Sequence, residues 1–213
     1  MGYDAEDTRR RIFAAAAAEF AEHGLAGARV DRIATAAKAN KQAIYLYFGG
    51  KEKLFAAILR AKLEAVAVSV TIDPEAVGES AGQIFDWYHE HPELIRLVLW
   101  ESLEACDTPA AEDHERRDGY RAKVRSLVDA GMACHLPEEA RVPAVQDLVF
   151  TVMGLIAWNF AVPRMCRMLL DEETSEAALA RRRAAVVEAA RTLAADFAPS
   201  RCAPEQPGAT TGD

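Results

Sequence analysis

The sequence predicts an all-α protein, with an N-terminal three-helix helix-turn-helix domain followed by a larger helical body. Alanine is abundant throughout and β-branched residues are scattered, a composition that favours helices over sheets. Between Val30 and Lys53, two short helical segments are joined by a tight turn, and two glycines precede a further helix. This layout is typical of a helix-turn-helix, a motif that places one helix in the major groove of DNA.

Apolar spacing and capping residues place the helices of the N-terminal domain. The first helix is expected to begin near Asp7 or Thr8, to run to His23 and to stop at Gly24. Its apolar positions recur at helical spacing and consist of Ile12, Phe13, Ala16, Ala17 and Phe20.

The next two helices form the helix-turn-helix itself. Small side chains in the second helix, 30–37, allow a close approach of the third helix, 41–47. Lys38-Ala39 is the expected turn, and Asn40 is a good N-cap for the third helix. A fourth helix follows the glycine pair and is expected to cover 51–69.

Prolines and capping residues divide the body into further helices. Because proline is favoured at the first helical position, Asp73-Pro74, His91-Pro92 and Thr108-Pro109 each predict a helix start. The remaining expected features are an apolar helix over 138–160 that Pro163 kinks or ends, a last helix from Thr174 or Ser175 to Phe197, and a disordered tail at 199–213 rich in Pro, Gly and Thr.

The charge of the chain is unevenly distributed. Its 213 residues carry a net charge of -8 and are 51% hydrophobic, enough to form a substantial core. Residues 1–64 contain 11 Lys and Arg against 8 Asp and Glu, whereas the rest contains 14 against 25. A mildly basic N-terminal segment on an acidic body fits a small DNA-binding module whose body stays away from the phosphates.

Cysteine usage and hydropathy indicate a cytoplasmic protein. The four cysteines, Cys106, Cys134, Cys166 and Cys202, form no C-x-x-C pair, so we expect reduced thiols and no zinc site. The chain has no apolar run of ~18 residues, so no transmembrane helix is expected. The N-terminus also lacks the apolar region of a signal peptide.

The third helix is expected to be the one that reads DNA. Lys41 can reach a phosphate or a guanine edge, Gln42 can pair with adenine, and Ala43 can contact a thymine methyl. Tyr45 and Tyr47 offer hydroxyls to phosphates, and Lys51 adds a positive charge at the start of the fourth helix. With Ile44 and Phe48 inward, the expected outward face consists of Lys41, Gln42, Ala43, Leu46 and Tyr47, with Tyr45 at its edge.

The N-terminal segment strongly resembles the TetR family of transcriptional regulators over about residues 8–56. The resembling positions are Ile12, Ala16, Phe20, Gly24, Val30, Ile33, Ala34, Ala37, Ala43, Ile44, Tyr45, Phe48, Lys51, Glu52 and Leu54. The resemblance implies a homodimeric regulator, usually a repressor, whose C-terminal domain dimerises and binds a small effector. Carried over by position, it also implies DNA contacts at Arg29, Lys41, Gln42, Ala43, Tyr45, Tyr47 and Lys51.

Two positions depart from the family pattern. Lys38 stands where the turn usually has glycine, and a positive φ at a non-glycine residue costs roughly 1 kcal/mol. Arg29 replaces a Ser or Thr cap but offers a phosphate contact. The run Arg9-Arg10-Arg11 has two interpretations, an arm that reaches DNA or a solvated charged face.

The body resembles one common type of TetR-family C-terminal domain in the segments 86–101 and 154–158. Two wide apolar helices predict a dimer interface at Val145, Val149, Val152, Ile156, Val186, Ala190, Leu193 and Phe197, with intramolecular core as the alternative. The candidate effector pocket consists of Phe85, Trp87, Tyr88, Trp100, Met132, Met153, Trp158 and Met165, for which core packing is again the alternative.

No motif for an enzyme accompanies these features. The sequence shows no catalytic triad pattern and no Gly-rich phosphate loop. His89-Glu90-His91 and Glu112-Asp113-His114 lack the spacing of a di-metal bundle, so no metal or cofactor is expected.

We therefore divide the chain into a DNA-binding domain at 1–52, an effector-binding and dimerisation domain at 53–198, and the tail at 199–213. The leading hypothesis is a repressor that an effector releases from a palindromic operator on double-stranded DNA. The alternatives are an activator on the same fold, or an all-α small-molecule-binding protein or enzyme without DNA affinity.

Overall fold

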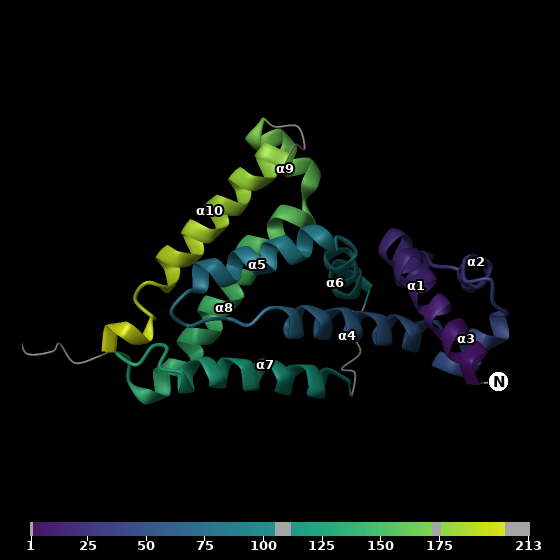
Figure 1. Ribbon diagram of the computed structural model, residues 1–213, viewed down its shortest axis with the longest axis horizontal. Helices are drawn as coiled ribbons and strands as arrows, with labels where there is room; N and C mark the ends of the chain where they lie inside the picture. Colours follow the sequence, from purple (N-terminus) through teal and green to yellow (C-terminus); the bar gives the residue numbers. More distant parts are fainter. Residues whose placement is uncertain (1, 105–111, 172–175, 203–213) are drawn as a thin grey trace, which may run out of the picture. The chain divides into compact units, whose positions relative to one another are not determined.

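The computed structural model describes residues 2–104, 112–171 and 176–202 (Figure 1). Within these ranges the chain forms ten α-helices, one short 3-10 helix and no strand, so the all-α prediction is confirmed. The chain divides into two compact units, each built from segments that are distant in sequence. The first comprises Met1–Thr71, Ile84–Pro109 and Ala157–Thr174, and the second comprises Ile72–Gln83, Ala110–Ile156 and Ser175–Asp213.

The first unit contains the helix-turn-helix. Its complete helices are α1 (Gly2–Gly27), α2 (Val30–Ala36), α3 (Lys41–Phe48), α4 (Lys51–Ser69), α6 (Glu93–Glu104) and α9 (Pro163–Leu170). The second half of α5 (Val77–Glu90) and the end of α8 (Glu138–Ala161) belong to it as well.

An apolar core joins α1, α2, α3, α4 and α6. Helix α1 contacts α2, α4 and α6, and α3 contacts both α2 and α4. Ile12, Phe20 and Ile33 are fully buried, as are Ile44 and Leu54. The Phe20 ring meets Phe55 edge to face at a centroid distance of 5.2 Å, a favourable aromatic geometry.

The predicted bounds of α2, α3 and α4 agree with the structure to within one residue, but those of α1 do not. Helix α1 begins at Gly2, and helical backbone resumes beyond Gly24, which has φ 69° and ψ -179° and marks a kink. A glycine is needed here because this backbone region is essentially closed to residues with a Cβ.

Three side chains of α6 dock on the end of α1 around this kink. Arg96 Nε and Trp100 Nε1 both donate to the Ala21 carbonyl, at 2.6 and 3.4 Å. One turn further on, Glu104 Oε2 accepts the Ala26 N–H at 3.0 Å. Because these residues follow at intervals of four, they form one stripe along α6 that we call the docking ridge.

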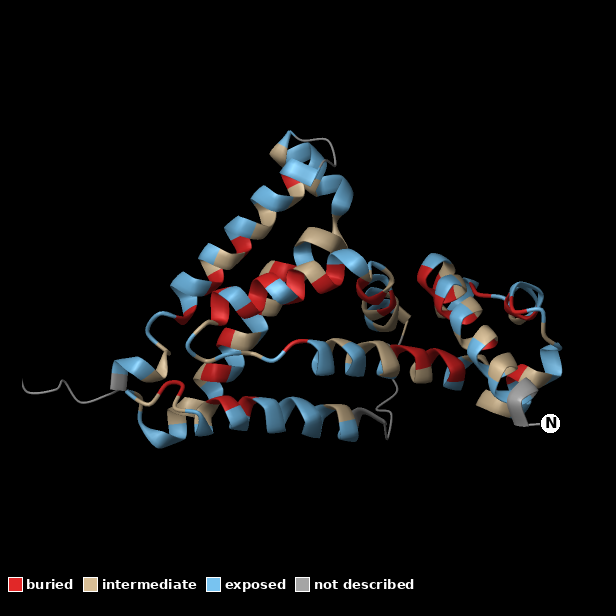
Figure 2. Cartoon of the chain, in the orientation of Figure 1, coloured by how far each residue is buried: buried red, intermediate tan, exposed pale blue. Residues whose placement is uncertain are grey.

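The second unit contains α7 (Glu112–Asp129), α10 (Glu176–Ala194), the first parts of α5 and α8, and a 3-10 helix at Pro199–Cys202. Glycines let α5 pack closely on α10. A Cβ on Gly78 would lie 2.8 Å from the Val187 carbonyl oxygen, and one on Gly82 would lie 2.9 Å from Val187 Cγ2. Figure 2 shows the buried residues concentrated along α5, whereas α7 and α9 are mostly exposed.

Helix α5 begins later than the predicted start at Asp73-Pro74. The Asp73 carboxylate accepts the Glu75 N–H, and the Asp73 N–H donates to Ser80 Oγ, both at 2.9 Å. These bonds stabilise a turn before Val77 and satisfy backbone groups that the helix would otherwise use.

Two other predicted helix starts, and most of the predicted tail, lie outside the described residues. The predicted starts at Thr108-Pro109 and at Thr174 or Ser175 lie outside them. The predicted disordered tail begins with the 3-10 helix, where the Ser200 N–H donates to Glu75, and the remaining 203–213 are outside the described residues.

The expectation of reduced cysteines is wrong at Cys134, which is disulfide-bonded. Cys166 is free, and its thiol lies 3.9 Å from the Asn159 carbonyl oxygen. Cys106 and the side chain of Cys202 lie outside the described residues. Sequence spacing missed the disulfide because a bond between distant cysteines depends on the tertiary fold.

The kink in α1 generates a stability prediction. In Gly24→Ala the new Cβ would stand 2.8 Å from the Trp100 ring and 2.6 Å from Glu104 Oε1, in a backbone conformation that alanine avoids. We expect the free energy of unfolding to fall by about 2 to 4 kcal/mol, measured by chemical denaturation. Gly27→Ala is the matched control, because its Cβ would meet nothing closer than His23 Cβ at 3.5 Å. Equal effects of the two substitutions would contradict this account of the kink.

Candidate DNA-binding surface

The turn between α2 and α3 adopts the predicted left-handed conformation at Lys38, with φ 49°. The Ala39 N–H donates to the Ala34 carbonyl at 3.0 Å, and the Lys38 N–H donates to Thr35 at 3.1 Å. Backbone hydrogen bonds thus offset the strain of a non-glycine residue in this region. The lysine at this position also gives the turn an exposed positive charge, which glycine would not provide.

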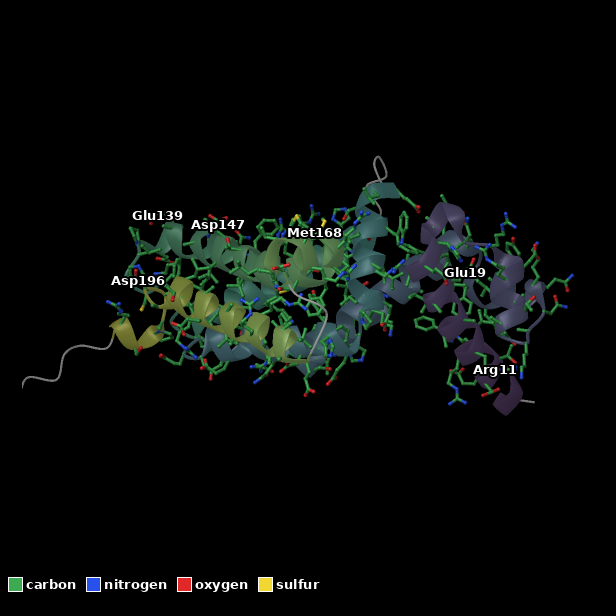
Figure 3. All side chains as sticks on the ribbon, turned by 90° about the horizontal axis from the view of Figure 1, so that it is seen from above. Arg11, Glu19, Glu139, Asp147, Met168 and Asp196 are labelled. Carbon is green, nitrogen blue, oxygen red and sulfur yellow. The ribbon has the colours of Figure 1, made fainter. Side chains whose placement is uncertain are left out.

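Arg11 braces the same turn from α1, from which it projects in Figure 3. Its Nη1 donates to the Ala37 carbonyl at 3.0 Å and to the Lys38 carbonyl at 3.3 Å. These are the orphan carbonyls at the end of α2, which a basic side chain can satisfy. Arg11 therefore stabilises the turn and is not part of a DNA-reaching arm.

The other two arginines of the run also have partners within the chain. Arg10 pairs with Asp7 at 2.9 Å, and the Arg9 guanidinium lies 5.6 Å from the centroid of the Phe48 ring. The structure thus favours the charged-face interpretation of the run over the arm.

Glu19 holds the start of α2, which lacks a side-chain cap at Arg29. Its Oε1 accepts the Arg29 backbone N–H at 2.9 Å and Arg32 Nε at 2.7 Å. Burial alone would raise the pKa of Glu19, but the hydrogen bonds from Arg32 and Arg29 prevail and hold the pKa below its usual value. A carboxylate from α1 thus replaces the hydroxyl cap that the sequence lacks.

Helix α3 begins as predicted and ends one residue later, at Phe48. Asn40 caps it, since its side chain accepts the Gln42 N–H at 2.9 Å, and Gly49 ends it in the left-handed conformation. Ile44 is fully buried beneath the helix, and the Phe48 ring lies 6.4 Å from that of Phe13. These inward contacts fix which face of α3 is left for a ligand.

The outward face of α3 carries most of the predicted DNA contacts. Arg29, Lys41 and Gln42 are exposed, and Tyr45 has 52% of its surface exposed. Ala43, Tyr47 and Lys51 are half-buried. Lys51 reaches inward, because its Nζ donates to the Ala28 carbonyl at 3.4 Å, so its role as a phosphate contact stays a prediction.

The predicted contacts omitted Leu46, on this face of α3, and Asp31, on the neighbouring helix α2. Leu46 is 79% exposed in the middle of α3, where an apolar side chain is suited to a thymine methyl. Asp31, near the start of α2, places Oδ1 2.9 Å from Lys41 Nζ. The hydrogen bond from Lys41 to Asp31 raises the pKa of the lysine above its usual value. Leu46 was recognisable from its outward position, whereas the Asp31 contact requires the tertiary structure.

The predicted effector residues are distributed over both units. In the first unit, Phe85 and Tyr88 are buried around Phe160, with ring centroids 4.9 and 5.9 Å away, and Trp87 stacks on His91 at 4.1 Å. Trp100 belongs to the docking ridge. Trp158 and Met165 have 56% and 37% of their surfaces exposed, while Met132 is buried and Met153 half-buried in the second unit.

The predicted dimer residues divide by burial. Five of them, Val145, Val152, Ile156, Val186 and Ala190, are at most 7% exposed in the single chain, so for these the burial favours the intramolecular alternative. Leu193 is 42% exposed, and Val149 and Phe197 are half-buried. The outer face of α8 also carries Phe150, which is 82% exposed, and Gly154, where an added Cβ would meet open space.

Among the residues that the structure describes, no three His, Cys, Asp or Glu side chains are placed to hold a metal ion. In the segment His89-Glu90-His91, for which no metal is expected, His91 Nδ1 lies 2.9 Å from the Trp87 carbonyl oxygen. The candidate functional surface of the described residues is the helix-turn-helix, in which α3 exposes a polar face.

Comparisons with known proteins agree with this site. The family described as bacterial regulatory proteins, tetR family, matches residues 12–58, and the tetracyclin repressor-like C-terminal domain matches residues 77–192. The chain is 41% identical to the HTH-type transcriptional repressor SCO4008 of Streptomyces coelicolor, over 78% of this chain and 85% of the relative. It is 34% identical to the repressor NicS of Pseudomonas putida, over 61% and 65%.

A solved structure supports the same assignment. The crystal structure of SCO4942 from Streptomyces coelicolor matches with a TM-score of 0.70 and 31% identity, over 87% of this chain and 97% of that one. The fold, the reading face and these matches define a DNA-binding transcriptional regulator rather than an enzyme. The chain belongs to the TetR family and is a transcriptional repressor of that family.

Helix α8 has the length and hydropathy of a membrane span. Among the described residues, α8 is long and apolar enough to cross a membrane by length and composition alone. It lies within the part matched by the tetracyclin repressor-like C-terminal domain, which identifies it as a helix of that domain.

The Glu19 contacts generate a pH-dependent prediction. Because the pKa of Glu19 is lowered by folding, its stabilising contribution is present above its unfolded pKa near 4.5 and is lost as the pH falls through the lower folded value. At pH 7, Glu19→Gln should reduce the free energy of unfolding by about 1 to 2 kcal/mol. The difference from wild type should shrink below pH 4.5, as measured by urea denaturation across pH.

Glu22→Gln provides the control for Glu19, because Glu22 is 73% exposed and its carboxylate lies 3.8 Å from His23 Nε2. A loss in Glu19→Gln that persists unchanged at low pH would show that the ionised carboxylate is not the stabilising species.

Proposed function

We propose that this repressor acts as a homodimer that binds a palindromic operator in the cytoplasm and is released by a small-molecule effector. The observation that carries the DNA-binding part is the division of α3 into a buried side at Ile44 and an exposed side at Gln42 and Tyr45. A helix packed on its inner side against α2 and α4, with polar side chains outward, has the properties of a recognition helix.

The proposed contacts divide into reading and positioning residues. Gln42 and Lys41 offer hydrogen bonds to base edges, and Ala43 and Leu46 offer apolar contact to thymine methyls. Arg29, Tyr45, Tyr47 and Lys51 are proposed to hold phosphates on the groove walls, which fixes the position of α3 without reading sequence.

A dimer would give the two reading helices a fixed separation. Two recognition helices must lie about 34–36 Å apart to enter successive major grooves, and the two-fold symmetry of the dimer would make the operator a palindrome. The proposed interface uses the exposed apolar side chains of α8 and α10, namely Phe150 and Leu193, with the half-buried Val149 and Phe197 beside them. Gly154 leaves room on α8 for a close approach by the partner helix.

Effector release needs a connection between the body and the reading helix. The aromatic group of Phe85, Tyr88 and Phe160 is the proposed centre of the effector site. It lies in the same unit as α6, whose docking ridge holds the end of α1 at Ala21 and Ala26. A shift of α6 would therefore move α1 and with it α3. By linkage, effector and operator would weaken each other's binding by the same factor.

The operator-binding proposal predicts a sequence-specific loss in Gln42→Ala. Removal of a bidentate base contact should weaken binding to the matching site by about 1 to 3 kcal/mol and leave non-specific binding nearly unchanged. The measurement is a salt-dependent fluorescence titration of labelled palindromic DNA from the upstream region of the gene. Gln146→Ala, an exposed glutamine on α8, should bind like wild type. If wild type shows no salt-sensitive binding, the proposal is refuted.

The dimer proposal predicts that Phe150→Glu produces a monomer. A charge placed on an apolar contact surface must be desolvated when the partner packs on it, so association should weaken by at least ~2 kcal/mol. Sedimentation equilibrium at several protein concentrations measures the shift. Val68→Glu alters an equally exposed valine on α4, 85% exposed, and should leave the dimer intact. A monomeric wild type, or an unaffected Phe150 variant, would contradict the proposed interface.

A further inference from the structure

Asp31 is an acidic residue on the proposed DNA-binding surface. Its carboxylate oxygen Oδ1 lies 2.9 Å from the amine of Lys41, the first residue of the recognition helix α3. Asp31 is 77% exposed and Lys41 is 49% exposed, so the pair stands at the surface rather than inside the fold. A negative charge at this place is unexpected, because the ligand that approaches it is itself negatively charged.

Structural stabilisation does not explain the pair well. An ion pair between two exposed side chains contributes little to stability because water and salt screen it. The main-chain carbonyl of Asp31 accepts Thr35 Oγ1 at 2.9 Å, an interaction that any residue at position 31 would provide. Asp31 lies in the first turn of α2, where the helix dipole favours a carboxylate, and its ion pair is with Lys41. Any effect of this carboxylate on DNA binding therefore acts through Lys41.

We propose that Asp31 is a specificity determinant that keeps Lys41 away from non-matching DNA. On a non-matching sequence, Lys41 has only phosphates to gain and remains with Asp31, so the two approach DNA as a neutral unit. On the matching operator, a guanine edge and a phosphate together replace the carboxylate, and Lys41 is released to them. Specificity is a difference of affinities, and a group that weakens the wrong complexes more than the right one increases it.

This inference rests on the proposed operator binding and makes a separate prediction. Asp31→Asn removes the charge that holds Lys41 and keeps a side chain of similar size. Affinity for a scrambled duplex should rise roughly 3- to 10-fold near 0.1 M salt, and the salt slope of that binding should steepen by about 1, as for one added phosphate contact. Affinity for the operator should rise less, so the ratio of specific to non-specific affinity should fall.

The experiment uses the full-length protein, the duplex that wild type selects from a randomised pool, and a scrambled duplex of the same length. Glu22→Gln is the matched control, because it removes one negative charge from the exposed surface of α1, where the ion pair of Glu22 is with His23 and not with a residue of α3. Its salt slope and specificity ratio should remain those of wild type. Circular dichroism confirms that each variant keeps the helical content of wild type.

Two results would overturn the inference. The first is an equal change in Asp31→Asn and Glu22→Gln, which would show that only net charge matters. The second is an unchanged effect of Asp31→Asn in a Lys41→Ala background, because the inference requires the released lysine. Failure of wild type to select any duplex would instead refute operator binding itself, so the two failures are distinguishable.

Discussion

The packing of α1 is the interaction on which the rest of the first unit depends. Ile12, Ala16 and Phe20 are fully buried on the side of α1 that meets its neighbours, and α1 contacts α2, α4 and α6. Burial of this apolar stripe fixes the angle between the helices, because interiors are close-packed and tolerate little displacement. The reading face of α3 is exposed in one orientation only as long as this packing holds.

Polar contacts from α1 complete what apolar packing starts. Arg11 satisfies the carbonyls at the end of α2, and Glu19 accepts the N–H at its beginning. A seven-residue helix is too short to be stable alone, so α2 depends on these side chains from another helix. The end of α1 is in turn held by the docking ridge on α6, whose Arg96 donates to Ala21. Helix α1 is thus held in place by α6, and it in turn holds α2 of the DNA-binding motif in place.

The basic side chains of the helix-turn-helix region differ in what holds them. The basic side chains of the motif are not simply free for phosphates: Arg11, Arg32 and Lys41 each have a partner within the chain. Arg11 and Arg32 serve the fold through carbonyl and carboxylate groups of α1 and α2. Lys41 is held by an exposed carboxylate that DNA can replace, and this difference separates a structural cation from one that can exchange partners.

The sequence by itself determined the helical class, the helix-turn-helix and the inward and outward faces of α3. These follow from local physics: Asn40 caps a helix within its own turn, Gly49 ends it, and Ile44 falls inward by helical periodicity. The family resemblance also predicted the left-handed turn at Lys38, because the turn position it occupies usually holds glycine.

Tertiary structure decided the features that join distant residues. The start of α5, the disulfide at Cys134, the bracing of α2 by Arg11 and Glu19, and the pair of Lys41 with Asp31 all depend on contacts that no local pattern contains. The wide apolar surfaces of α8 and α10 show the same limit. Periodicity identified Val145 and Ala190 as apolar positions, but only the packed chain showed that they are buried within it and that Phe150 is left exposed. Hydrophobicity selects which residues leave water, and the arrangement of helices selects which neighbour covers them.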